Sequence, residues 1–289
     1  MRQIRITVRP NASFEVPYSD GYQVYSAMLS HIQKTNSNIS QYIHDKPLNS
    51  IALSGLLGTF SNSNRLGHKK VISDQSYEIR IGIIDPLGDE IFESLIQPLF
   101  LPDAFLSLDQ GSLTIERVET CSVIFSEMLT EVAKYKRQKL AFVFLTPTCI
   151  SFKNSTITEM FPHRIAVFRS LLSKWNQVCP DGMRMDISSD DFGRYLIEKP
   201  DPESFKTHSV LVNTVFDRKK EHPRPIFKQG FICRCTYLFS QDAPVSFRNA
   251  VTLLTLFAPF SGVGSSVARG CGHVETVIQE ISYDKRSGC

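Results

Sequence analysis

The alternation of hydrophobic and polar residues sets the order of strands and helices in the N-terminal half of this chain. At 2–9, Ile4, Ile6 and Val8 alternate with polar residues, which predicts a strand with one buried face. At 21–34, apolar positions recur along one stripe, which predicts a helix. The predicted series is strand, helix, strand, strand, helix, strand, at 2–9, 21–34, 51–57, 77–84, 90–99 and 113–118.

This order is that of the ferredoxin-like fold. The second half predicts a related set: an apolar run at 140–145 with a hairpin partner near 150–152, a helix at 164–177, strands at 209–216 and 231–239, a helix at 245–257 and a last strand at 274–278. A length of 289 residues also suits two domains. We therefore predict an α+β protein of two tandem ferredoxin-like (RRM-like) domains, at 1–133 and 138–289, with a glycine-rich loop near the C-terminus.

Composition and charge exclude few classes of function. Hydrophobic residues make up 42% and charged residues 21% of the chain, which is ordinary for a globular protein. No apolar run approaches the roughly 20 residues that cross a bilayer. Arg5 and Arg9 interrupt the N-terminal stretch, so no signal peptide is predicted, and we expect a cytoplasmic protein without a membrane partner. The net charge of +3 permits RNA binding but does not indicate it.

The seven cysteines predict neither a disulfide framework nor a zinc site. Their number is odd, and none of them form a CxxC pair. Cys233 and Cys235 lie two apart in a predicted strand, so both should pack on one face as small hydrophobic side chains. Asp190 and Asp191 are expected in an exposed turn rather than at a metal. No metal and no cofactor are predicted.

The most specific motif is the segment SGVGSSVARGCG at 261–272, between a predicted helix and a predicted strand. Two Gly–hydrophobic–Gly units flank Arg269. Glycine readily adopts positive φ, so the backbone N–H groups of such a loop can turn toward an anion. The spacing fits neither a phosphate-binding P-loop nor a dinucleotide fingerprint. A flexible connection with a bulge is the alternative, and the symmetry of the two units favours anion binding.

The motif resembles the glycine-rich loop of the RAMP superfamily, and in particular the CRISPR-associated endoribonuclease that processes precursor guide RNA. The N-terminal segment FEVPYSDGYQVYSAMLSHIQKTNSNISQYIHD at 14–45 is similar to the opening of the same family. It has the V-P-Y start, the tyrosine-bearing first helix, and a short second helix that ends in Y-h-H. The layout of 140–154 also resembles the start of the family's second domain.

The resemblance implies an endoribonuclease that cuts a CRISPR repeat RNA at the 3′ base of its hairpin. The family needs no metal, leaves a 2′,3′-cyclic phosphate and a 5′-hydroxyl, and often retains the product for an effector complex. The implied partners are CRISPR repeat RNA and other Cas subunits, with the chain itself a monomer or homodimer. The implied RNA-binding residues are those of the loop: Gly262, Gly264, Ser265, Ser266, Arg269, Gly270 and Gly272. A polar loop at 61–70, with Lys69, would suit further phosphate contacts.

Cleavage by the neighbouring ribose 2′-hydroxyl needs a proton acceptor, a proton donor and a group that stabilises the phosphorane charge. Histidine suits either proton-transfer role, and His44 falls at the family's catalytic position. Its alternative role is a helix C-cap. The family's catalytic tyrosine aligns with Leu29, so Tyr25, one turn earlier, is the substitute candidate, with core packing as its alternative role. The family's lysine aligns with Ser50, and Lys46 is the nearest cation.

Two other readings stay open. A non-catalytic RAMP subunit that only binds guide RNA in an effector complex would keep the glycine-rich loop but would not need His44. A general RNA-binding module of two RRM-like folds would stack bases on aromatic residues of its sheet, and the predicted strand YEIRIGII at 77–84 lacks that aromatic spacing.

Overall fold

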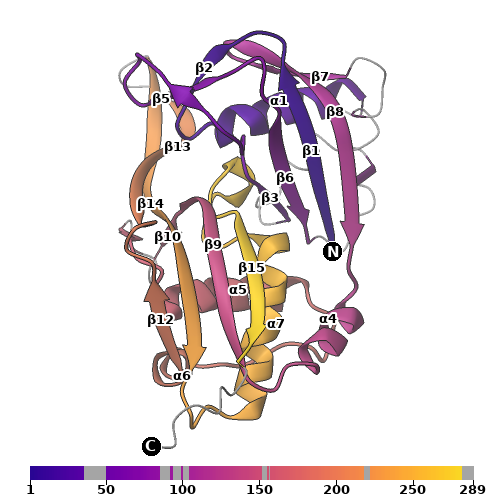
Figure 1. Ribbon diagram of the computed structural model, residues 1–289, viewed down its shortest axis with the longest axis vertical. Coiled ribbons are helices and arrows are strands. Elements are labelled where there is room, and N and C mark those ends of the chain that lie inside the picture. Colours follow the sequence, from indigo (N-terminus) through magenta and orange to yellow (C-terminus); the bar gives the residue numbers. More distant parts are fainter. Residues whose placement is uncertain are drawn as a thin grey trace, which may run out of the picture.

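The computed structural model describes residues 1–35, 50–84, 92–93, 99, 104–151, 155, 157–217 and 222–281. The chain forms two α+β halves, with the N-terminal half at the top of Figure 1 and the C-terminal half below it. The predicted fold class is confirmed. The predicted short helix that ends near His44 lies outside the described residues, as does the predicted helix at 90–99 except for 92–93 and 99.

The N-terminal half contains a five-stranded antiparallel sheet in the order β3-β6-β1-β8-β7. Its strands are β1 (Arg2–Pro10), β3 (Ile51–Leu53), β6 (Tyr77–Ile83), β7 (Phe105–Leu108) and β8 (Gly111–Ser122). Helix α1 (Gly21–Thr35) follows β1, and its Val24 and Met28 join the core that β1 forms with Ile4, Ile6 and Val8. The alternation that predicted β1 therefore arises from burial against α1. The order β8-β1-β6-β3 is that of a ferredoxin-like domain.

A small second sheet in this half corrects the prediction of a polar loop at 61–70. Strands β2 (Phe14–Pro17), β5 (His68–Val71) and β4 (Ser61–Asn62) form an antiparallel sheet in the order β2-β5-β4. Lys69 turns inward, with its Nζ 3.2 Å from Oδ2 of the buried Asp20 and 3.8 Å from the centre of the Phe60 ring. Lys69 is thus a partner of a buried carboxylate rather than an exposed phosphate contact.

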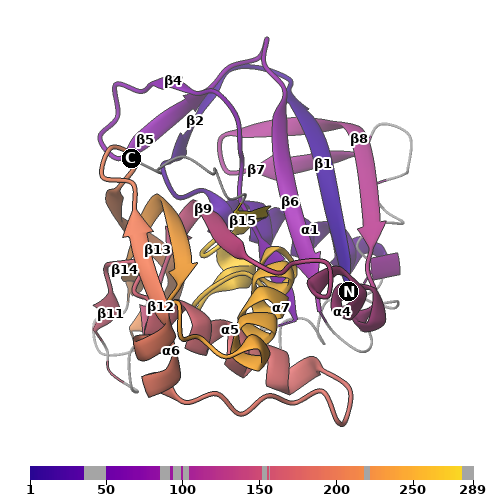
Figure 2. The same ribbon diagram turned by 60° about the horizontal axis from the view of Figure 1, so that its bottom comes forward.

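The C-terminal half repeats the strand order on a larger core. Strands β9 (Gln138–Thr148), β12 (Leu196–Pro200), β14 (His222–Phe239) and β15 (Val274–Glu280) pair in the order β12-β14-β9-β15. Helices α5 (Arg164–Val178) and α7 (Val245–Ser261) lie on one side of this sheet (Figures 1 and 2). The core between them contains Trp175, Phe142 and Phe257. Cys233 and Cys235 are each 2% exposed in the same core, as predicted.

Several elements depart from the sequence-based expectation. Strand β13 (Lys206–Asp217) pairs with the first part of β14 as a long hairpin that rises beside β5 in Figure 1. Strand β10 (Ile150–Ser151) pairs with β11 (Thr158–Glu159) and not with the run at 140–145. Asp190 and Asp191, predicted in an exposed turn, lie instead in the first turn of helix α6 (Ser189–Tyr195). The helix begins there because the Ser188 side chain accepts a hydrogen bond from the N–H of Asp191.

Helix α4 (Phe125–Val132) connects the two halves and packs with the second core through Met128 and Val132. The division into domains at 1–133 and 138–289 stays a prediction. Close backbone contacts join the halves directly. A side chain at Gly21, the first residue of α1, would overlap the backbone of Gly270, and one at Gly82 of β6 would overlap the backbone carbonyl of Phe260. No helix among the described residues is long and apolar enough to span a membrane.

Candidate functional site

The glycine-rich loop leaves the C-terminal end of α7 and leads into β15. Its four glycines all have positive φ, from +61° at Gly262 to +85° at Gly270. Between them, Val267–Arg269 form a short 3-10 helix, η2, which Ser266 precedes in the left-handed conformation with φ +59°. The sequence therefore predicted correctly that these positions need the conformational freedom of glycine.

The direction of the loop's N–H groups corrects the expectation that they turn toward an anion. Most of them donate to acceptors within the protein: the N–H of Gly264 bonds to Ser170 Oγ at 2.8 Å, that of Ser265 to the Cys149 carbonyl at 2.8 Å, and that of Gly272 to the Pro147 carbonyl at 3.0 Å. Within the described part of the chain, the N–H groups without such an acceptor are those of Ser266, Val267 and Ala268.

Close packing explains why glycine occupies these loop positions. A Cβ at Gly264 would come 2.5 Å from the Cys149 carbonyl oxygen, and a Cβ at Gly272 would overlap the Val263 carbonyl. A Cβ at Gly270 would overlap Gly21 at the start of α1. The loop therefore packs against β9 on one side and against the N-terminal half on the other.

Lys228 adds a cation to this loop that sequence reasoning missed. The residue lies on β14, and its Nζ donates to Ser265 Oγ at 2.9 Å and to Ser266 Oγ at 3.2 Å. It is half-buried, and no ion pair involves it among the described residues. A local motif around Lys228 does not reveal this position, because its partners lie nearly forty residues away in the chain.

Arg269 contacts the protein more than the solvent. Its Nη1 donates to the Val212 carbonyl on β13 at 2.7 Å, and its Nε is buried without a partner in the described structure. Its guanidinium carbon lies 6.0 Å from the centre of the Tyr22 ring on α1. Arg269 thus links the loop to both the hairpin and the N-terminal half.

Tyr25 packs in the N-terminal core and is 9% exposed. Burial raises the pKa of its hydroxyl, and the nearby charge of Arg269 opposes that increase. The other two candidate catalytic residues, His44 and Lys46, lie outside the described residues. The structure therefore describes the RNA-binding candidates but only Tyr25 of the catalytic candidates.

A buried lysine holds the start of the loop. Lys174 of α5 is 6% exposed, and its Nζ donates at 2.9 Å to both the Ser261 and the Gly262 carbonyls. Burial lowers its pKa to about 7. Its ammonium satisfies carbonyls at the C-terminal end of α7, where a cation also suits the helix dipole.

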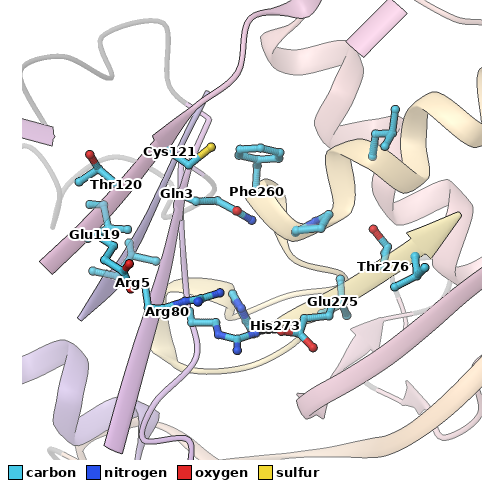
Figure 3. A pocket seen from close by; sticks show the side chains of 16 residues that line it. Gln3, Arg5, Arg80, Glu119, Thr120, Cys121, Phe260, His273, Glu275 and Thr276 are labelled. Carbon is cyan, nitrogen blue, oxygen red and sulfur yellow. Dashed lines mark hydrogen bonds and ion pairs between the residues drawn. The ribbon is translucent and has the colours of Figure 1, made fainter. Parts of the chain in front are cut away.

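A cleft of about 740 Å³ lies between the two halves, with strands β1, β6 and β8 on one side and helix α7 and the edge strand β15 on the other (Figure 3). Arg80 of β6 reaches across it to form an ion pair with Glu275 of β15. His273 lies beside this pair, buried, with its Nδ1 lacking a partner among the described residues. Burial, with the charge of Arg80 as the second cause, lowers the pKa of His273 to about 3, so its ring is neutral near pH 7.

Comparisons with known proteins connect this geometry to one family. The family model of the CRISPR-associated endoribonuclease Cas6 matches residues 142–274, a range that includes most of β9, the β13–β14 hairpin, α7 and the whole glycine-rich loop. The chain is Cas6-like. The resemblance that the loop suggested is thus confirmed. A comparison with curated proteins finds no match.

Solved structures extend the Cas6-like similarity to nearly the whole fold. A Cas6 product complex superposes with a TM-score of 0.66 at 18% identity, covering 96% of this chain and 98% of that chain. Thermus thermophilus Cas6 gives 0.62 at 17% identity, with the same coverage. A Cas6-related protein from Pyrococcus furiosus gives 0.62 at 14% identity, covering 95% of this chain and 98% of that one. At these identities the comparison establishes the fold.

In the Cas6-like fold, the glycine-rich loop and the first helix are neighbours. The loop belongs to the C-terminal half and α1 to the N-terminal half, yet Gly270 contacts Gly21 and Arg269 approaches Tyr22. Sequence reasoning identified both segments separately. Their contact, and the roles of Lys228 and Lys174 at the loop, depend on tertiary structure.

Proposed function

We propose that this chain is an endoribonuclease that cuts precursor CRISPR RNA within its repeats, without a metal, to leave a 2′,3′-cyclic phosphate and a 5′-hydroxyl. The observation that carries the proposal is the Cas6 family match over 142–274, which contains the whole glycine-rich loop. The contact between that loop and the start of α1 supports it, because α1 leads directly into the segment that carries His44.

The proposed reaction uses the ribose 2′-hydroxyl beside the scissile phosphate as the nucleophile. His44 transfers a proton at the nucleophile or at the leaving 5′-oxygen, and Lys46 stabilises the charge that develops on the phosphorane. Tyr25 has no such role unless its hydroxyl reaches the RNA from the core, where it is 9% exposed. We therefore assign the chemistry to His44 and Lys46.

In this proposal the glycine-rich loop binds the RNA, but fewer of its groups contact the RNA than the motif alone predicts. Lys228, the hydroxyls of Ser265 and Ser266, and the N–H groups at 266–268 are the groups suited to a phosphate. Gly262, Gly264, Gly270, Gly272 and Arg269 hold these groups in place. The exposed side chain of Arg224 extends the basic surface along the hairpin. The product stays bound and passes to other Cas subunits, with the chain a monomer or homodimer.

Replacement of His44 tests the chemistry. His44→Ala should bind repeat RNA as tightly as the wild type but cut it roughly 100-fold or more slowly, the usual contribution of a general acid or base. His222→Ala, an exposed histidine at the start of β14, is the matched control and should cut at the wild-type rate. Cleavage should continue in chelator. Full activity of His44→Ala, or loss of wild-type activity in chelator, would contradict the mechanism.

One observation favours the non-catalytic alternative. Tyr25, the only tyrosine offered as a substitute for the family's catalytic residue, packs in the hydrophobic core. A subunit that only binds guide RNA would have no need of an accessible tyrosine. Binding of repeat RNA without any cleavage by the wild-type protein would decide for this alternative.

A further inference from the structure

A pair of buried cysteines lies beneath the glycine-rich loop. Cys149 follows β9, Cys271 lies in the loop between Gly270 and Gly272, and both side chains are 0% exposed. The two side chains pack together with Val210 and Val212 of β13 in a small cluster of their own. The Cys149 thiol donates to the Pro147 carbonyl at 4.0 Å. The pair is therefore separate from the main core of either half.

The backbone holds these two residues in adjacent segments. The N–H of Gly272 donates to the Pro147 carbonyl at 3.0 Å, and both the N–H and the hydroxyl of Ser265 donate to the Cys149 carbonyl, at 2.8 and 3.0 Å. Gly230 leaves room for the sulfur, since a Cβ there would come 2.8 Å from Cys149 Sγ. A disulfide needs adjacent backbones and neighbouring side chains, and this arrangement supplies both.

The two thiols differ in acidity. The neighbouring Cys271 thiol, together with the ammonium of Lys228, lowers the pKa of Cys149 despite its burial. The neighbouring Cys149 thiol, with burial, raises the pKa of Cys271. Cys149 is thus the thiol that becomes the nucleophile, because the thiolate is the reactive form.

We propose that Cys149 and Cys271 form an intramolecular disulfide when the protein meets a peroxide, and that this cross-link ties the glycine-rich loop to the end of β9. The Cys149 thiolate attacks one oxygen of the peroxide and the O–O bond breaks, which yields a sulfenic acid and a hydroxide; the hydroxide takes up the proton that the thiol had released and becomes water. The Cys271 sulfur then attacks the sulfenic sulfur, the S–O bond breaks, and the hydroxyl leaves as a second water with the Cys271 proton. The two sulfurs supply the two electrons that reduce the peroxide.

The cross-link has a consequence for RNA that rests on the proposed function. The two sulfurs must approach to about 2.05 Å to bond, so the loop moves toward β9. Ser265 and Ser266, which Lys228 holds in place, move with it. RNA binding should therefore weaken on oxidation and recover on reduction.

Oxidation of the purified full-length protein tests the cross-link directly. After treatment with hydrogen peroxide and alkylation under denaturing conditions, digestion should yield a peptide that links Cys149 to Cys271. The exposed Cys121 shows that the oxidant acted. Cys233 and Cys235 are the matched control: they are as well buried, their pKa values are raised to about 12, and same-face positions of one strand lie too far apart to bond. Oxidation of Cys121 without the Cys149–Cys271 peptide would overturn the proposal.

A second measurement connects the cross-link to RNA. The affinity of oxidised wild-type protein for repeat RNA should fall several-fold and return after reduction, while Cys271→Ser keeps its affinity through the same treatment. If Cys271→Ser fails to fold, the reversible change in the wild type still decides. A linked peptide with unchanged affinity would overturn the effect on RNA alone. Failure of the reduced protein to bind repeat RNA would count against the proposed function and leave the peptide result standing.

Discussion

At the scale of single residues, the loop positions require glycine for two reasons: a positive φ, and neighbouring atoms that leave no room for a Cβ. Gly270 has φ +85° and contacts Gly21, whereas Gly182 has φ +88° and has no atom within 4 Å of a Cβ. Gly182→Ala should therefore destabilise by about 1–2 kcal/mol from backbone strain alone. Gly270→Ala should lose that amount and about 1–3 kcal/mol more from overpacking. Chemical denaturation of both variants measures the difference.

The same pair of variants separates folding from RNA binding. If Gly270 serves the packing of the loop, the RNA affinity of Gly270→Ala should fall together with its stability. Equal stability losses in the two variants would show that the contact with Gly21 contributes nothing. A loss of affinity without any loss of stability would restore the simpler view that the glycine contacts RNA.

His273 makes the free energy of unfolding sensitive to acid. Its pKa is lowered from 6.5 to about 3 in the folded state, so the unfolded chain binds the extra proton between these values. Its contribution to stability is therefore fully present above pH 6.5 and is lost as the pH falls toward 3, by roughly 1.4 kcal/mol per unit of pKa difference. His273→Gln should show a shallower decline of unfolding free energy over this range. Parallel pH profiles would contradict this assignment.

At the scale of elements, the β13–β14 hairpin brings Lys228 to the loop. Lys228→Ala should weaken repeat RNA binding and make its salt dependence shallower by about one phosphate contact. Lys134, just after the end of α4, forms an exposed ion pair with Glu131, so Lys134→Ala is the matched loss of one positive charge. Affinity titrations at several salt concentrations measure both. An equal effect of the two variants would mean that only net charge matters.

At the scale of the whole molecule, two kinds of contact join the halves. Gly82 lets β6 approach the Phe260 carbonyl, and Arg80 pairs with Glu275 across the cleft. Gly82→Ala should lower the unfolding free energy by about 1–3 kcal/mol through overlap. Glu275→Gln should change it by less than about 1 kcal/mol, because the carboxylate is 45% exposed. Thermal melting compares the two, and a larger loss in Glu275→Gln would reverse the ranking.

The sequence by itself determined the order of the main elements. The helix predicted at 164–177 is observed at Arg164–Val178, and the strand predicted at 2–9 is observed at Arg2–Pro10. Helical and strand periodicity arise from burial of one face, so they are written locally in the sequence. Short elements such as β10 and α6 span too few residues for a period to show, which is why their pairing or existence was missed.

Only the tertiary structure decided what the glycine-rich loop can do. The motif correctly indicated positions of positive φ, because that requirement is local to each glycine. The acceptors of its N–H groups, Pro147, Cys149 and Ser170, lie about 90 residues or more away and carry no recognisable spacing. Lys228 reaches the loop from another strand. Hydrogen bonds form between groups that the fold brings together, so the segment alone could not tell whether its N–H groups were free for an anion.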